Sequence, residues 1–287
     1  MAIAVVTGSS TGIGEATAVS LARAGHTVYA TMRNPQTGGE GLLKVAAQEN
    51  LPLRLAKLDV DKDESVREAF GAILAEAGRV DVLVNNAGVG QSGSVEEQPM
   101  EWFRETMETN FFGALRCIKA VVGGMRERGE GCIVNVTSVA GRLASASHGS
   151  YVASKFALEA LSESLAQEVK GFGVRVAIVE PGVIATPIFK KLKEPPVETL
   201  YPHARRMQEM FRASLEKPVS PYVVGEKIRE IVDSGTWQVR HPVGPDAAGI
   251  LAWRASMSDE QWADHGTITD AQWVKYMREN FGLNVSL

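Results

Sequence analysis

The sequence predicts an α/β fold in which helices cover both faces of a doubly wound parallel sheet, within a single domain. Three observations support this prediction. Short β-rich runs alternate with helical patterns, several of those runs are continuously apolar, and a glycine-rich turn joins the first run to the first helix. Continuous apolar strands are typical of parallel sheets that are buried on both faces. A chain of 287 residues is long enough for one such domain.

The first strand is expected at Ile3 to Val6, and a helical run follows over Glu15 to Ala22. Further strands are expected at Thr27 to Met32, Leu53 to Asp59, Asp81 to Ala87, Cys132 to Ser138, Arg175 to Pro181 and Trp237 to Val243. Each strand ends in a polar or glycine cluster, and the carboxyl ends of parallel strands share one edge of the sheet. Turn formation alone explains any one cluster, but their joint placement predicts a ligand site at that edge.

The turn after the first strand reads Thr7-Gly8-Ser9-Ser10-Thr11-Gly12-Ile13-Gly14. Three residues separate Gly8 from Gly12 and one separates Gly12 from Gly14, so the spacing is not GxGxxG. Glycines at a strand-to-helix junction let backbone N–H groups approach a pyrophosphate, and the helix N-terminus favours the anion. A dinucleotide is the expected ligand, although such a turn taken alone could be purely structural.

Tyr151 and Lys155 lie one turn apart on a helical pattern over Tyr151 to Lys170, so their side chains share one face of the helix. An ammonium about 6 Å from the phenol, at an effective dielectric constant of about 20, is worth roughly 3 kcal/mol, or about two pKa units. We therefore expect the pKa of Tyr151 to be about 8, which suits a general acid and base.

Composition argues against several other functions. The formal net charge of −4 provides no broad positive field for nucleic acid. Cys117 and Cys132 are the only cysteines and lie in apolar contexts, which indicates inert core thiols and a reducing cytoplasm. No apolar stretch reaches about 18 residues and no signal peptide precedes the first strand, so we expect no membrane partner. The histidines lack ligand spacing, and we expect no metal.

These motifs together resemble the short-chain dehydrogenase/reductase family, in the subdivision marked by TGxxxGxG, NNAG, a lone asparagine, a serine, YxxxK and PG. All of them occur here in order, from Thr7 to Thr186. The resemblance implies a Rossmann-type fold, a nicotinamide cofactor and hydride exchange with a carbonyl group. The stretches Val28 to Arg33 and Ser154 to Glu159 look like the branch that contains 17β-hydroxysteroid and retinol dehydrogenases.

The resemblance also implies roles for single residues. Tyr151 exchanges the proton, Ser138 orients the carbonyl oxygen, and Lys155 also holds the nicotinamide ribose. Asn110 anchors a water of a proton relay, although this residue alone could equally mark a helix kink or a buried cap. Asp59 contacts the adenine edge. The full set of expected cofactor residues is Gly8, Ser9, Ser10, Gly12, Ile13, Gly14, Arg33, Asp59, Val60, Asn86, Ala87, Gly88, Tyr151, Lys155, Pro181, Gly182, Val183 and Thr186.

Cofactor preference depends on the end of the second strand, where NAD enzymes place a carboxylate for the ribose 2′-hydroxyl. This chain has Met32 there, followed by Arg33. Arginine can pair with a 2′-phosphate, and a charge-assisted bond of roughly 1.5 to 3 kcal/mol favours the phosphorylated cofactor by about ten- to a hundred-fold. NADP(H) is expected and NAD(H) is the alternative, in which Arg33 is only a solvated turn residue.

By resemblance, a substrate lid follows Pro181 and Gly182 and spans 183–221. Its apolar stripe of Met207, Met210, Phe211 and Leu215 is usual for core packing, but on a lid it can line an adaptable hydrophobic pocket. An apolar ketone, aldehyde or alcohol is therefore the expected substrate. Expected substrate contacts are Ala140, Arg142, His148, Val183 and Ile188.

The lid is also rich in basic residues. We interpret them as a solvated helix face, although they could instead bind an anionic substrate such as an acyl carrier thioester. These residues are Lys190, Lys191, Lys193, Arg205, Arg206 and Arg212.

Residues 1–245 are expected to form the domain, and 246–287 extend beyond the compact family pattern. Ser258 and Thr269 each begin a capping-box pattern, so the extension should be helical. It could cover the core, close the substrate entrance or cover a neighbouring subunit in a homodimer or homotetramer.

The expected function is that of an NADP(H)-dependent ketone or aldehyde reductase. The alternatives are a β-oxoacyl thioester reductase and, more remotely, a non-catalytic NADP-sensing protein that kept the fold.

Overall fold

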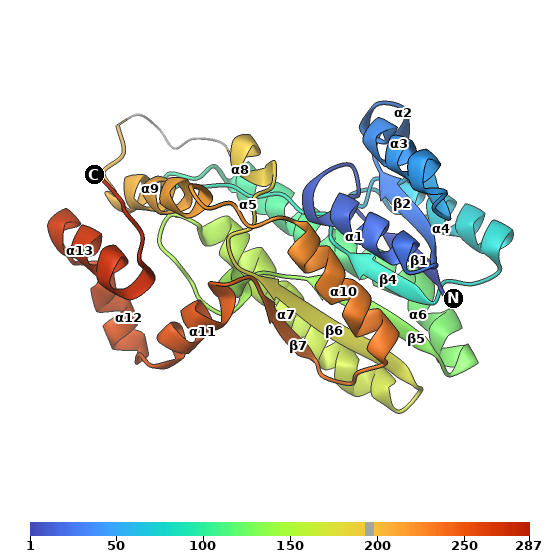
Figure 1. The fold of residues 1–287 in the computed structure, drawn as a ribbon. Coiled ribbons are helices and arrows are strands. Elements are labelled where there is room, and N and C mark those ends of the chain that lie inside the picture. The colour runs from blue at the N-terminus through green and yellow to red at the C-terminus, as the bar shows by residue number, and fades with distance from the viewer. Residues whose placement is uncertain (193–197) are drawn as a thin grey trace.

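The computed structural model describes residues 1–192 and 198–287, and within them the seven expected strands form one parallel sheet (Figure 1). The strand order is β3-β2-β1-β4-β5-β6-β7, so the winding direction reverses between β1 and β4. The strands are Ile3–Val6 (β1), Thr27–Met32 (β2), Leu53–Lys57 (β3), Val82–Asn85 (β4), Gly131–Val136 (β5), Val174–Pro181 (β6) and Arg240–Val243 (β7).

Helices connect these strands and extend beyond the sheet at its carboxyl edge. Those that follow the strands are Gly12–Arg23 (α1), Pro35–Gly38 (α2), Glu40–Glu49 (α3), Asp63–Ala77 (α4), Met100–Met107 (α5), the π-helix Glu108–Gly113 (η1), Ala114–Arg128 (α6), the 3₁₀ turn Val139–Gly141 (η2), Gly149–Lys170 (α7) and Tyr222–Ser234 (α10). The outer helices are Ile188–Lys191 (α8), His203–Leu215 (α9), Ala247–Ala255 (α11), Asp259–His265 (α12) and Asp270–Phe281 (α13).

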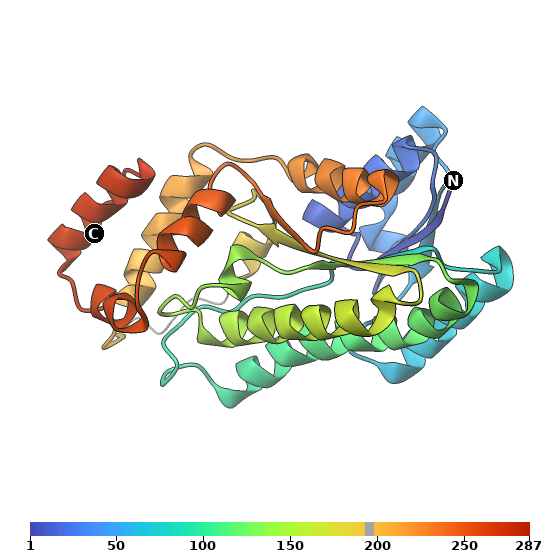
Figure 2. The same cartoon turned by 90° about the horizontal axis from the view of Figure 1, so that it is seen from below.

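Each face of the sheet packs on its own apolar core. Helices α1, α3 and α10 cover one face, and α4, α6 and α7 cover the other (Figure 2). Along β1, Ala4 and Val6 belong to the first core while Val5 belongs to the second. Burial on both faces explains why the strands are apolar without alternation. The prediction of a doubly wound parallel sheet is confirmed.

The structure corrects several strand boundaries. Strands β3, β4 and β5 end at Lys57, Asn85 and Val136, each two residues before the expected end. Strand β7 begins at Arg240, three residues after the expected start. At the carboxyl edge the chain turns out of the sheet early, and the polar residues beyond each strand therefore lie in loops that can face a ligand.

The helices α9 and α11 to α13, which we call the cap, gather at the carboxyl edge of the sheet (Figure 1). Helix α13 packs on α9 through a small apolar cluster of its own, which contains Ala213, Trp273 and Met277. The two helix starts expected in the extension are confirmed, because Ser258 and Thr269 each form a capping box. Helix α11, which the sequence did not suggest, lies between them and β7.

Cys117 and Cys132 are unpaired and buried. Burial raises the pKa of the Cys117 thiol to about 12 and that of the Cys132 thiol to about 11, so both stay protonated at neutral pH. The interpretation of both as inert core thiols is confirmed.

Among the helices of residues 1–192 and 198–287, none has the length and apolar character that a membrane crossing requires.

Helices α1 and α10 approach closely at Gly225, where a Cβ atom would lie 2.8 Å from the carbonyl carbon of Ala16. We expect Gly225→Ala to push the helices apart and to lower the free energy of unfolding by about 1 to 3 kcal/mol. Gly71 is the matched control, because it lies within α4 and a Cβ atom added there would have nothing within 4 Å. Gly71→Ala should raise stability by about 1 kcal/mol. Urea denaturation measures both, and equal effects would contradict a tight α1–α10 contact.

Candidate active site

The glycine-rich loop between β1 and α1 is shaped by close approach to the end of β4. Gly8 and Gly12 have φ angles of 67° and 65°, in the left-handed region that favours glycine. A Cβ on Gly8 would lie 2.8 Å from Cα of Ala87. The Thr7 hydroxyl accepts hydrogen bonds from the backbone N–H groups of Asn86 and Ala87, each at 3.0 Å. The two loops therefore support each other at the point where the sheet winding reverses.

One cavity of about 770 Å³ runs along the carboxyl edge of the sheet and reaches the cap. Most of the residues expected from the sequence line it. These are Gly8, Ser10, Gly12, Ile13, Arg33, Asp59, Val60, Asn86, Ala87, Gly88, Ser138, Ala140, His148, Tyr151, Lys155, Pro181, Gly182, Val183, Thr186 and Ile188.

Three expected contact residues are not among those that line the cavity. The Ser9 hydroxyl is buried and donates to the Val6 carbonyl at 2.8 Å, so it stabilises the loop from beneath. Gly14 closes the turn, since a Cβ there would lie 2.4 Å from the Gly8 carbonyl oxygen. The exposed Arg142 guanidinium lies outside the cavity lining, 3.5 Å from the Glu180 carboxylate, which also pairs with Arg240. Ser9, Gly14 and Arg142 thus lie outside the cavity lining, and their contact with a ligand stays a prediction.

Ser138 follows β5 and caps the η2 turn. Its hydroxyl oxygen accepts from the backbone N–H of Ala140 at 3.1 Å, and the hydroxyl donates to the Pro181 carbonyl at 3.4 Å. The bond to Pro181 joins the ends of β5 and β6, and the two bonds together hold the hydroxyl at the cavity wall beside Tyr151.

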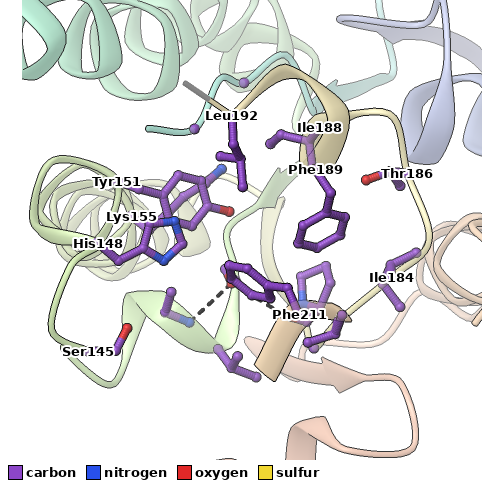
Figure 3. A pocket seen from close by; sticks show the side chains of 18 of the residues that line it. Ser145, His148, Tyr151, Lys155, Ile184, Thr186, Ile188, Phe189, Leu192 and Phe211 are labelled. Carbon is purple, nitrogen blue, oxygen red and sulfur yellow. Dashed lines mark hydrogen bonds between the residues drawn. The ribbon is translucent and has the colours of Figure 1, made fainter. Parts of the chain in front are cut away.

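Tyr151 and Lys155 enter the cavity from the first turns of α7 (Figure 3). The Lys155 ammonium donates to the Val136 carbonyl at 3.0 Å and lies 5.6 Å from the centre of the Tyr151 ring. The His148 ring stacks on the Tyr151 ring with 4.7 Å between centroids and 14° between planes. The phenol is therefore held between a cation and a second aromatic ring.

The pKa values of this pair differ from the sequence-based expectation. Burial raises the pKa of Tyr151 to about 12, and the Ser138 hydroxyl lowers it only in part. Burial lowers the pKa of Lys155 to about 8, with an opposing effect from Glu159. The expected value of about 8 for Tyr151 counted the attraction between the two charges and neglected the cost of desolvating each. It is wrong for this structure, in which the phenol keeps its proton at neutral pH.

Asn110 lies in the π-helix η1, a distortion that is frequent at functional sites. Its carboxamide accepts from the Val89 N–H at 2.8 Å and donates to the Val89 carbonyl at 2.9 Å. It also donates to the Ser154 hydroxyl at 2.9 Å. Asn110 therefore clamps the loop after β4 to α7, while its role in a water relay stays a prediction.

The half of the cavity next to Tyr151 is apolar and aromatic. Phe189 and Phe211 face the Tyr151 and His148 rings, with Ile188 and Leu192 above them (Figure 3). Phe211 makes an edge contact with His148 at 5.9 Å between centroids. Burial lowers the pKa of His148 to about 4, so this imidazole is neutral at pH 7. Of the expected lid stripe, Met207, Met210 and Phe211 line the cavity and Leu215 does not.

The basic residues of the lid do not form one solvated face. Arg206 is buried, and its guanidinium donates to the Asp270 carboxylate and to the Ile268 carbonyl, both at 2.8 Å. The interpretation as a solvated face is therefore wrong for Arg206, because this side chain joins α9 to the start of α13. Lys193 lies outside the described residues.

Sequence reasoning did not identify the cap residues that line the cavity, among them Trp253, Trp262 and His265. The available signal was compositional, because three of the five tryptophans of the chain fall in 246–287. Periodicity could not show that they face the same cavity as Tyr151.

The described part of the chain brings together no group of three or more His, Cys, Asp or Glu side chains that could hold a metal ion.

Comparison with known proteins gives a consistent result. Residues 2–196 match the family model described as short chain dehydrogenase. A 3-ketodihydrosphingosine reductase of Bacteroides thetaiotaomicron is 42% identical over 180 residues, 63% of each chain. Bovine retinol dehydrogenase 8 is 44% identical over 195 residues, 66% of this chain and 61% of the relative. Rat estradiol 17-beta-dehydrogenase 1 is 34% identical over 238 residues, which cover 80% of this chain and 68% of the relative. The matches to the first two relatives thus span less than two thirds of their lengths.

Solved structures show the same likeness over more of the chain. A short-chain dehydrogenase from Streptomyces avermitilis superposes with a TM-score of 0.79 at 34% identity, covering 93% of this chain and 99% of that one. Actinorhodin polyketide ketoreductase with NADPH gives a TM-score of 0.76 at 27% identity, covering 86% and 97%. The expected family is confirmed, and so is the resemblance to its hydroxysteroid and retinol dehydrogenase branch.

The Asn110 clamp can be tested by stability. Asn110→Ala should leave the Val89 N–H, the Val89 carbonyl and the Ser154 hydroxyl without their partner, and should lower the free energy of unfolding by about 2 to 4 kcal/mol. Ser154→Ala removes only one of these bonds and should cost about 1 kcal/mol. Thermal or urea unfolding compares them, and equal losses would show that Asn110 does not act as a clamp.

Proposed function

The chain belongs to the short-chain dehydrogenase family, and from this membership we propose an NADP(H)-dependent oxidoreductase. It exchanges hydride between nicotinamide and a ketone or secondary alcohol, or an aldehyde and its alcohol, whose body is hydrophobic. The observation that carries the proposal is the position of Ser138, Tyr151 and Lys155 in one cavity. That cavity has a glycine-loop wall on one side and an aromatic wall on the other.

The residues present fit a dinucleotide. Gly8 and Gly12 line the cavity without side chains that would cover their backbone, and the N-terminus of the twelve-residue helix α1 opens into it. A bound nicotinamide supplies hydride in reduction and accepts it in oxidation. Lys155 would hold the ribose hydroxyls.

Arg33 supports the preference for the phosphorylated cofactor. It is exposed, lines the cavity, and has no ion-pair partner among residues 1–192 and 198–287. Burial raises the pKa of the nearby Asp61 carboxyl, and the Arg33 charge opposes that shift only in part. A free guanidinium at this position suits a 2′-phosphate, and the ketoreductase solved with NADPH is a related case.

Proton transfer is assigned to Tyr151. In reduction the phenol donates its proton to the carbonyl oxygen, which the Ser138 hydroxyl polarises by a hydrogen bond. A pKa of about 12 keeps the phenol protonated and ready for this step at neutral pH. The resulting phenolate is stabilised by the Lys155 ammonium, which lies 5.6 Å from the ring. In oxidation Tyr151 accepts the proton, so that direction should gain from higher pH.

A hydrophobic substrate is supported by the aromatic wall and by two relatives whose names concern retinol and 3-ketodihydrosphingosine. A carrier-bound thioester has less support, because the buried Arg206 is already paired with Asp270. A non-catalytic sensor has less support still, because Tyr151 and Lys155 are both in place.

Tyr151→Phe removes the acidic proton and keeps the ring that stacks on His148. We expect turnover to fall by about 10²- to 10⁴-fold while the affinity for NADPH stays unchanged. Steady-state oxidation of NADPH with a panel of apolar ketones and aldehydes measures turnover, and calorimetric titration measures the affinity for NADPH. Full activity in this variant would rule out the proposed proton transfer.

Arg33→Ala should weaken NADPH binding by about ten- to a hundred-fold and leave NADH binding nearly unchanged. The control is Arg67→Ala, which removes an exposed arginine of α4 that does not line the cavity. Titration of both cofactors against both variants makes the comparison. If Arg33→Ala weakens NADH as much as NADPH, Arg33 has a structural role and the NADP(H) preference lacks support.

A further inference from the structure

The cap extends the cavity well beyond the reacting groups. Trp253, Trp262, His265 and Phe281 line the same cavity as Tyr151, although they come from α11, α12 and α13. We call this part of the wall the distal wall. A small ketone held at Tyr151 has no need of it, and its presence therefore bears on the size and chemistry of the substrate.

The distal wall consists largely of aromatic rings, and both of its indole N–H groups already have hydrogen-bond partners. Trp253 makes edge contacts with Trp262 and with Phe281, each at 5.0 Å between centroids. The Trp253 indole N–H donates to the Tyr276 hydroxyl, and the Trp262 indole N–H donates to the Ala144 carbonyl at 2.6 Å. Both indoles remain half-buried, so apolar surface is left for a ligand to cover.

His265 is the polar exception in this wall. Its ring lies among Trp253, Trp262 and Tyr276, at 5.4, 6.0 and 4.6 Å between centroids. Within the described part of the chain, neither imidazole nitrogen has a hydrogen-bond partner. Burial and the nearby Arg206 charge lower the pKa of His265, so the ring is neutral at pH 7 with one donor and one acceptor nitrogen.

Two other polar side chains that line this end of the cavity, Arg206 and His203, already have partners. Arg206 is paired with Asp270, and His203 bonds to the Gly266 carbonyl at 2.8 Å. No free cation therefore faces the distal end among residues 1–192 and 198–287. Arg254, which lies over the Trp262 ring, is likewise paired with Asp259. A neutral imidazole suits a hydroxyl or carbonyl oxygen, whereas a carboxylate would have to compete with Asp270 and Asp259 for these cations.

We propose that the substrate carries a second oxygen, a hydroxyl or a carbonyl, at the end of its apolar body remote from the reacting carbon. The body lies against Trp253 and Trp262, and the second oxygen forms a hydrogen bond with His265. This inference rests on the proposed function, because it takes Tyr151 as the reacting end of the cavity.

A homologous series of alkan-2-ones, each paired with its ω-hydroxy analogue, tests the chain length at which a substrate reaches the distal wall. Calorimetry measures binding to the NADPH-loaded protein made inert by Tyr151→Phe, and kcat/KM is measured with the wild type. Both should rise by about fourfold for each methylene that reaches the distal wall. At the length that reaches His265, the ω-hydroxy ketone should bind at least as tightly as the plain ketone.

Variants separate the two parts of the proposal. Trp262→Ala should flatten the dependence on chain length, while Trp237→Ala, which removes an exposed tryptophan outside the cavity, should not. His265→Phe should make the ω-hydroxy ketone bind about tenfold more weakly than the plain one, and His265→Gln should restore part of its affinity.

Equal effects of His265→Phe on the two ketones, or turnover of short ketones with no dependence on length, would overturn the proposal and leave the proposed function intact. Length-dependent binding without turnover of any carbonyl by the wild type would instead contradict the proposed function and support the distal wall as a binding surface.

Discussion

All seven strands run in the same direction, and the position of every functional group depends on this constraint. Parallel strands open their carboxyl ends on one edge, so loops from β1, β4, β5 and β6 meet although they are far apart in sequence. The reversal of winding between β1 and β4 places the glycine loop beside Asn86, where Thr7 bonds both segments together. The cavity is the space that these loops and the cap enclose.

Polar groups buried behind the cavity hold its wall in place. Asn85, Asn135 and Ser162 form a chain of hydrogen bonds, each 2.8 Å long, from β4 through β5 to α7. This chain ties the strand that leads to Ser138 to the helix that carries Tyr151. Buried amides cost free energy unless they are paired, so the pairing specifies one arrangement of these elements.

Charged side chains also connect neighbouring elements, here beneath the η2 turn that follows Ser138. Arg240 of β7 pairs with Glu180 at 2.9 Å and also with Glu159 of α7. A Cβ on Gly141 would lie 2.8 Å from Cγ of Glu159, so the Glu159 side chain packs directly against the η2 turn. Burial also explains the pKa values of Tyr151 and Lys155: the same packing that positions the pair disfavours its charged forms. Positioning and proton affinity thus have one physical origin.

The sequence by itself determined the alternation of strands and helices, the glycine turn, the spacing of Tyr151 and Lys155, and the capping boxes at Ser258 and Thr269. These features depend on neighbours within a few residues, which a pattern can show. Only the tertiary structure decided that Ser9 and Arg142 lie outside the cavity lining, that Arg206 is buried, and that the cap forms the distal wall. It also showed that the pKa of Tyr151 is raised and not lowered. The direction of a side chain and the cost of its desolvation depend on segments that pack on it from elsewhere in the chain. The residues next to it in the sequence do not show which segments those are.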